Sequence, residues 1–490
     1  MNSTPPQSAQ SHSAFTRRKA MEAESVGDLH RTLGVTSLAM LGIGSTIGTG
    51  IFFVLPEAVP KAGPAVILSF VIAAITAGLT ALCYAELSAR IPGSGSSYTF
   101  TYATLGEFAA FVVSACLLLE YGLAGSATAI GWSAYLNNFL DNTVGWQIPE
   151  ALRSPMIVAG SNGAEFHTGQ FNLPPVLLVI LCGVLLVRGV KESVGANTAL
   201  VWIKICVLVF FAAVALTGFN STHFTPFFFA EDGKGGGGMP GVTAAAATVF
   251  FSFIGIDAVA TGGAEAKDPK RTVPLAILIA LLVVSGAYFL VAVAAVGAQP
   301  ATKFAGQDAG LAVIVKDVTG QAWPAIVLSA GAVISVFSVT LVSLYGQTRI
   351  LYAMSRDGLI GARFARVDEA THTPRFNTVV VCIVVGLIAG TVDSGFLWDM
   401  VSMGTLTAFS LVSAAVPVVR AMQARDGTPN EAGFRVPFGP YLIPFASIAS
   451  CLYIMKDLSK TTFTVFGIWI VLALIWYFSY AMKNSALAKS

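Results

Sequence analysis

The sequence predicts an all-α polytopic membrane protein with twelve transmembrane helices, and two bulk properties and one pattern support this fold class. Hydrophobic residues make up 55% of the 490 positions, and the mean hydropathy is +0.74. Charged residues make up 11%, compared with roughly 25% in a typical soluble domain. The pattern is a succession of apolar stretches, most of them long enough to cross the ~30 Å hydrocarbon core of a bilayer. We therefore exclude a soluble enzyme.

The apolar stretches follow a polar tail over residues 1–31, which is rich in Ser, Gln and Pro. The tail has no apolar core of the signal-peptide kind, so we expect it to lie in the cytoplasm. The fourth and ninth stretches are shorter than the others. The twelve stretches cover about residues 33–60, 64–90, 105–136, 174–188, 194–219, 240–263, 273–298, 323–348, 376–392, 396–419, 441–456 and 461–482.

The first stretch contains a run of glycines, Gly42, Gly44, Gly48 and Gly50, within nine residues. Each glycine costs about 1 kcal/mol relative to alanine inside a helix. A helix that breaks in hydrocarbon must also find partners for the N–H and C=O groups that it frees. Glycines allow close helix packing as well, but four in nine residues exceed what packing needs. The run therefore predicts a broken helix whose backbone binds a small solute, as in transporters.

The sixth stretch mirrors the first, since residues 250–263 place glycines and Asp257 at membrane depth. If stretches one to five and six to ten are two copies of one unit, an odd number of helices per copy makes the copies insert with opposite orientation. Both broken helices would then meet near the middle of the bilayer. This predicts a first five-helix repeat over residues 32–222, an inverted second repeat over 239–420, and two additional helices over 441–483.

The distribution of Lys and Arg predicts the orientation of the chain. With the N-terminus inside, twenty of the 28 basic residues lie on the cytoplasmic side and seven on the other, and Lys204 remains inside a membrane segment. Cytoplasmic loops are enriched in Lys and Arg. We therefore expect both termini to be cytoplasmic.

Several other functions find no support in the residues. The six cysteines lie within apolar stretches and form no CxxC pair, and the five histidines are scattered. We therefore expect no metal site and no cofactor other than a coupling proton. No nucleotide-binding loop is present, and we expect no nucleic-acid partner. No cysteine lies in an outer loop, so a covalent glycoprotein partner is not expected, whereas a small accessory subunit is left open.

With these segments in hand, the chain resembles the amino acid–polyamine–organocation superfamily, and within it the cationic amino acid transporter family. The resemblance implies a five-plus-five inverted repeat with two extra helices, transport of amino acids, and a plasma-membrane location. It spans roughly residues 30–480. The matching stretches are 42–52, Tyr84-Ala85-Glu86-Leu87, 92–98, Leu119-Glu120-Tyr121, Lys204, 253–257, 268–271, 355–358 and Phe434-Arg435-Val436-Pro437.

An amino acid carries a carboxylate and an ammonium close together, and the two predicted breaks complement them. Free N–H groups and the positive end of a half-helix at the first break suit the carboxylate. Carbonyls freed at the second break suit the ammonium. The candidates are Ile43, Gly44, Thr46, Gly48, Thr49 and Gly50 for the carboxylate, and Phe250, Phe251 and Ile254 for the ammonium.

Lys204 lies in the middle of an apolar segment, where a charged side chain costs several kcal/mol. That position suits a group that takes and releases a proton during transport. By resemblance, this lysine occupies the sodium site of related carriers, contacting Gly42 or Ile43 and the hydroxyls of Ser335 or Ser338. The alternative is a permanently charged strut that links helices.

Two carboxylates allow two interpretations each. Asp257 either attracts a cationic side chain of the substrate or caps the second half of its broken helix. Glu120 either contacts the substrate or is a hydrogen-bonded carboxylate facing the bundle. Val336, Phe337 and Met403, judged from their positions in the eighth and tenth stretches, are expected to form apolar walls of the pocket together with Phe251 and Ile254.

The function expected from this sequence is secondary active symport of amino acids with protons, by alternating access. The resemblance implies cationic substrates such as arginine, lysine and ornithine, and members also carry small neutral amino acids. The alternatives are an amino acid exchanger, a sensor that binds amino acids without transporting them, and a channel. A channel is disfavoured, because none of the predicted helices carries a row of charges along its length.

Overall fold

A computed structural model of the chain describes residues 17–19, 33–48, 50–91, 97–160, 163–189, 194–231, 236–261, 263, 266–368, 371, 373–425 and 433–489. The α-helices are α1 (Val35–Thr46), α2 (Leu55–Ala62), α3 (Val66–Arg90), α4 (Ser97–Thr104), α5 (Glu107–Val144), α6 (Leu173–Val187), α7 (Val194–Thr217), α8 (Gly238–Phe250), α9 (Ala258–Thr261), α10 (Pro269–Ala298), α11 (Gly310–Thr319), α12 (Trp323–Arg356), α13 (Arg375–Thr391), α14 (Ser394–Arg425), α15 (Leu442–Met455), α16 (Lys460–Trp476), α17 (Met482–Asn484) and α18 (Ala486–Lys489). Short 3-10 turns join several of them, and a π-turn, η8 (Tyr477–Ala481), continues α16.

The prediction of a polytopic helical membrane protein is confirmed. Among the described residues, eight helical runs are long and apolar enough to cross a membrane, and four shorter apolar helices accompany them. Two features were not predicted. A two-stranded antiparallel hairpin, β1 (Ile157–Gly160) and β2 (Gly163–Phe166), follows α5. The short helix α11 lies between α10 and α12.

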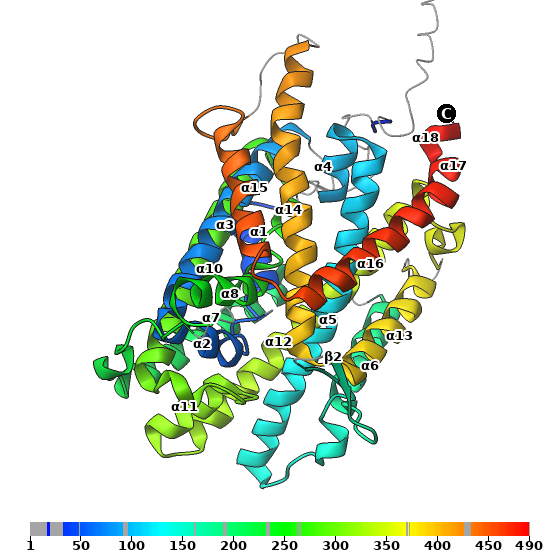
Figure 1. Ribbon diagram of the computed structural model, residues 1–490. Helices are drawn as coiled ribbons and strands as arrows, with labels where there is room; N and C mark the ends of the chain where they lie inside the picture. The colour runs from blue at the N-terminus through cyan, green and yellow to red at the C-terminus, as the bar shows by residue number, and fades with distance from the viewer. Residues whose placement is uncertain are drawn as a thin grey trace, which may run out of the picture.

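The long helix α5 lies near the centre of the bundle, with α12 and α14 packed along it (Figure 1). On the other side of the molecule, α10 packs against both α3 and α1. Helices α1 and α8 are thus held inside the bundle rather than at its edge, and 83% of the apolar window of the α8 segment is buried. This packing encloses the points where those two helices break.

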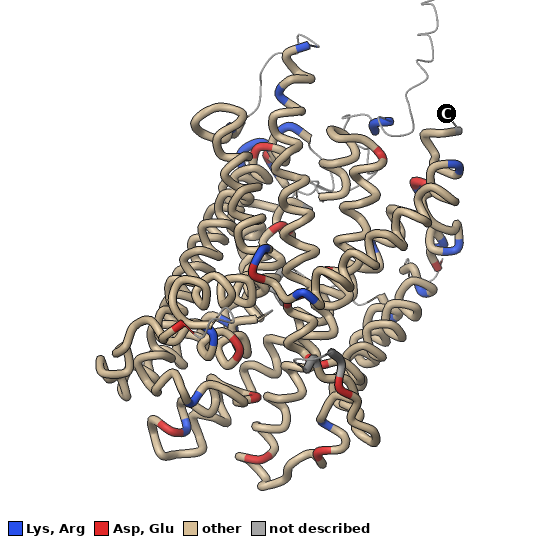
Figure 2. Tube along the Cα trace, in the orientation of Figure 1, with Lys and Arg blue, Asp and Glu red and all other residues tan. Residues whose placement is uncertain are grey.

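Basic residues gather at the end of the molecule that carries the C-terminus, as Figure 2 shows. At that end, Glu86 on α3 is fully buried and is the centre of a polar network. Arg420 on α14 donates from Nε and Nη2 to its two carboxylate oxygens, at 2.6 and 2.5 Å. The backbone N–H of Val436 donates to the same carboxylate at 2.8 Å, and Arg90 Nε lies 2.8 Å from it. Glu86 therefore ties α3, α14 and the segment before α15 together.

Replacing Glu86 with Gln should destabilise the protein strongly. Removing one member of a buried ion pair leaves its partner uncompensated, at a cost of about 3 kcal/mol or more. We expect the thermal unfolding temperature in detergent to fall by several degrees. Glu165→Gln, at an exposed position on β2, is the matched control and should leave it unchanged. Equal unfolding temperatures for the two variants would contradict a structural role of the network.

Candidate functional site between two broken helices

The first break begins where α1 ends at Thr46. Ile47 has extended backbone, with φ −69° and ψ 115°, and Gly48 follows with φ +115°. Only glycine adopts this conformation at little cost, so Gly48 is where the chain leaves the helix axis before α2 starts at Leu55. Among the described residues, the backbone N–H groups of Gly48, Gly50 and Ile51 donate to no carbonyl. These amides are available to an anionic group.

The second break has the same backbone pattern, an extended residue followed by a glycine with positive φ. Helix α8 ends at Phe250 and tightens into a 3-10 turn over Phe251–Phe253. Ile254 is extended, with φ −65° and ψ 143°, and Gly255 has φ +95°. The chain then enters α9 at Ala258. Among the described residues, the Ile254 carbonyl accepts no backbone hydrogen bond, so it can accept one from an ammonium group.

The two breaks touch each other. The Ser45 hydroxyl lies 2.7 Å from the Gly255 carbonyl and can donate to it. A side chain at Gly50 would meet Ser252 at once, since an added Cβ would lie 2.4 Å from the Ser252 hydroxyl. The breaks therefore lie against each other and form a single candidate site.

Tyr288 on α10 is a third element of this site and was not among the residues predicted from the sequence. Its hydroxyl lies 2.9 Å from the Thr46 carbonyl and 2.9 Å from the Ser252 carbonyl, so it can donate to either. The residue is fully buried. A tyrosine inside an apolar stretch usually finds a partner for its hydroxyl. That rule indicates a polar contact for Tyr288, but not which carbonyls provide it.

Lys204 on α7 is 1% exposed and reaches the first break. Its ammonium donates to the Gly44 carbonyl at 2.5 Å, one or two residues beyond the Gly42 or Ile43 contact that we expected. The hydroxyls of Ser335 and Ser338 donate to carbonyls of their own helix, those of Gly331 and Ser335, at 2.7 and 3.1 Å. The Ser335 carbonyl in turn faces the break, 3.5 Å from where a Cβ on Gly48 would lie.

The predicted apolar wall is partly assembled. Phe250, Phe251, Ile254 and Met403 are buried in the main core, which also contains Ile43. Phe337 is only partly buried and packs instead against a separate cluster formed by α5, α6, α12 and α13. Its neighbour on α12, Val336, was also expected in the wall and does belong to the main core. Gly44 and Thr46 are buried at the end of α1, and Thr49 lies outside the described residues.

Asp257 directly precedes α9, which is the position of a helix cap, and it is 6% exposed. Glu120 on α5 is 1% exposed and is an electrostatic neighbour of Asp257. Each has one carboxylate oxygen, Oδ1 of Asp257 and Oε2 of Glu120, with no hydrogen-bond partner in the described part of the chain. Both interpretations of these carboxylates therefore remain predictions.

An aromatic layer covers one side of the site. The ring of Phe53 stacks on Trp398 of α14, with centroids 5.6 Å apart and an angle of 17° between planes. Phe251 lies 6.1 Å from Trp398 and 6.5 Å from Phe53. Beyond these rings, Lys61 on α2 donates to the Thr248 hydroxyl of α8 at 2.8 Å. These contacts link the first break, α2, the end of α8 and α14.

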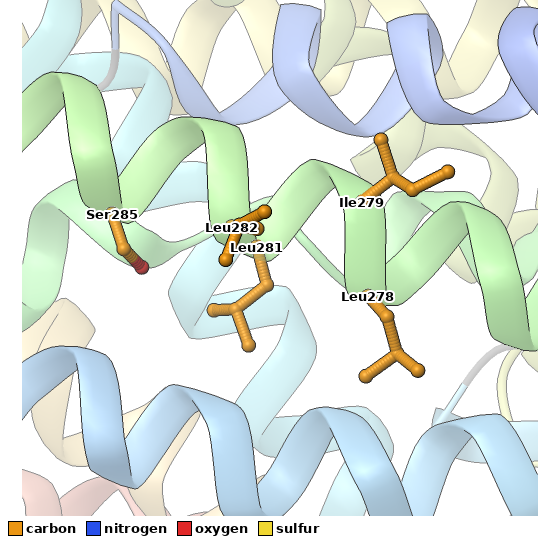
Figure 3. Close-up of a pocket in the computed structure, with 5 residues that line it drawn as sticks. All are labelled: Leu278, Ile279, Leu281, Leu282 and Ser285. Atoms are coloured by element: carbon orange, nitrogen blue, oxygen red, sulfur yellow. The ribbon is translucent and has the colours of Figure 1, made fainter.

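A groove of about 440 Å³ lies elsewhere, on α10 (Figure 3). Leu278, Ile279, Leu281, Leu282 and Ser285 line it. Leu282 is 76% exposed and Ile279 is 38% exposed. Exposed apolar side chains on a membrane helix face lipid, so this groove belongs to the lipid-facing surface and not to the site between the breaks.

Comparison with known proteins adds independent information. A family model described as amino acid permease matches residues 33–485. The chain is 39% identical to the methylthioribose transporter of Bacillus subtilis, over 97% of this chain and 100% of that protein. It is also 39% identical to the branched-chain amino acid permease BcaP of the same organism, over 94% of this chain and 95% of that protein. Cationic amino acid transporter 4 of Mus musculus is 34% identical, over 84% of this chain and 63% of that protein.

Proposed function

Because this chain belongs to the amino acid permease family, we propose that it carries L-amino acids across the plasma membrane in symport with protons. The observation that carries the proposal is the pair of touching breaks. Within the described part of the chain, the amides of Gly48 and Gly50 donate to no carbonyl and the Ile254 carbonyl accepts no backbone hydrogen bond, and these groups belong to the two segments that touch. This arrangement complements the carboxylate and the ammonium that all α-amino acids share.

Lys204 is the proposed proton carrier. Its buried ammonium contacts the carbonyl of Gly44, so a change in its charge acts directly on the first break. A change in the surroundings of a buried lysine can switch its side chain between the neutral and the charged form. Tyr288 and Ser45 connect the first break to the second, which offers a route from the proton to the substrate.

We also propose that the chain crosses the membrane twelve times, contains a five-plus-five inverted repeat and has both termini in the cytoplasm. Each break contains one glycine with positive φ, Gly48 in the first and Gly255 in the second, as related copies of one unit would. Alternating access would then move the two broken helices together around the substrate.

The substrate is an amino acid with either a cationic or a neutral side chain, and different observations favour each class. The buried carboxylates of Asp257 and Glu120 favour a cationic side chain, which is one of the two interpretations that the sequence left open for each. The 39% identity with a branched-chain amino acid permease, compared with 34% for a cationic amino acid transporter, favours a neutral one. Apolar Phe250, Phe251 and Met403 around the breaks agree with this second class.

Uptake into proteoliposomes tests the proposal. With an acidic outside, labelled arginine or leucine should accumulate and a protonophore should abolish the accumulation. Unlabelled arginine, lysine, alanine and leucine, used as competitors, separate the two substrate classes. Uptake that requires amino acid preloaded inside, with or without a proton gradient, would replace symport by exchange. Binding without any uptake would leave the sensor interpretation.

A further inference from the structure

Two side chains of α14 contain buried polar atoms that the proposed function does not use. The indole N–H of Trp398 and the hydroxyl of Ser402 have no hydrogen-bond partner among the described residues. Trp398 is 4% exposed and Ser402 is 0% exposed. Burying a donor without a partner is costly, and most buried polar groups in native proteins are paired. Two such groups on one helix indicate that a ligand provides their hydrogen-bond partners.

Both groups lie on the face of α14 that contacts the end of α8 and the second break. Residues 398, 402 and 409 are spaced by four and seven positions, so they lie along one face of α14. At one end of this face, Trp398 contacts Phe251, with ring centroids 6.1 Å apart. At the other end, Phe409 contacts Phe250 edge-on at 6.0 Å. Ser402 lies between Trp398 and Phe409 along this face of α14.

We infer that Trp398 and Ser402 form a hydrogen-bonding subsite for the side chain of the substrate. Among neutral amino acids of one size, the protein should therefore prefer those with a hydroxyl oxygen. The indole N–H would donate to that oxygen, and the serine hydroxyl can donate or accept. This inference rests on the proposed function, because the breaks must hold the backbone of an amino acid for its side chain to reach α14.

Threonine and valine are the sharpest probes, because they have nearly the same shape and differ by a hydroxyl and a methyl group. In proteoliposomes, the apparent affinity for labelled L-threonine should exceed that for L-valine by about tenfold, the contribution of one or two hydrogen bonds. Ser402→Ala should lower this ratio to near one. Trp398→Phe keeps a ring against Phe53 and Phe251 while removing the N–H, so it should lower the ratio as well.

Ser410→Ala is the control on the same helix, since that hydroxyl already donates to the Leu406 carbonyl at 2.8 Å. It should leave the ratio unchanged. If Trp398→Phe fails to fold, Ser402→Ala decides alone. Equal affinities for threonine and valine in the wild-type protein, with uptake intact, would overturn the inference and leave the proposed function standing. Absence of uptake of any amino acid would overturn both.

Discussion

Replacing Lys204 with Met should abolish proton-driven accumulation of amino acid, with a loss of about a hundredfold or more. Methionine fills a similar volume but cannot hold a proton, and the Gly44 carbonyl loses its charged donor at 2.5 Å. Uptake is measured in proteoliposomes with and without an acidic outside. The exposed Lys316 of α11 is the matched control, and Lys316→Met should transport like the wild type.

Lys204→Arg separates the two interpretations of this residue. Arginine keeps the positive charge but does not release its proton under these conditions. A proton carrier therefore fails with arginine, whereas a charged strut survives, at least in part. Wild-type accumulation in Lys204→Arg would contradict proton coupling through this residue, and would assign Lys204 to holding α7 against the first break. Exchange of labelled for unlabelled amino acid, which needs no proton gradient, checks that the variants still bind substrate.

Hydropathy was sufficient to locate the helices, because the cost of exposing polar backbone to lipid restricts a chain of this composition to helical spans. Each of the twelve predicted stretches coincides with a helix or with two helices joined by a break, as at residues 33–60. The breaks were predictable for a related reason. Gly48 and Gly255, with φ of +115° and +95°, occupy conformations that a side chain would strain, and glycine runs mark such positions in the sequence.

Contacts between distant segments were not predictable in the same way. Val336 and Phe337 were both expected to line the site, but one residue on a helix corresponds to a rotation of about 100°, and of the two only Val336 reaches the main core. Tyr288 contacts a carbonyl 242 residues away, and Trp398 contacts the rings of Phe53 and Phe251, one from each broken segment. No local pattern contains that information.

The junction between the breaks provides the second large expected effect, for Gly255→Ala. Gly255 has φ +95°, where a residue with a side chain is strained by about 1–2 kcal/mol. Its new Cβ would also lie 2.8 Å from the Ser45 carbonyl oxygen, which is backbone and cannot swing away. We expect the two breaks to separate, amino acid uptake to fall at least tenfold, and the unfolding temperature in detergent to drop.

Gly286→Ala is the matched control, because an added Cβ at this position within α10 meets no atom within 4 Å. Alanine is preferred over glycine in a helix by up to about 1 kcal/mol, so this variant should be as stable as the wild type or slightly more so. The comparison removes any general effect of losing a glycine from a membrane helix. If Gly255→Ala transported like Gly286→Ala, contact between the broken helices would not be needed for transport. Binding would then depend on the amides of the first break alone.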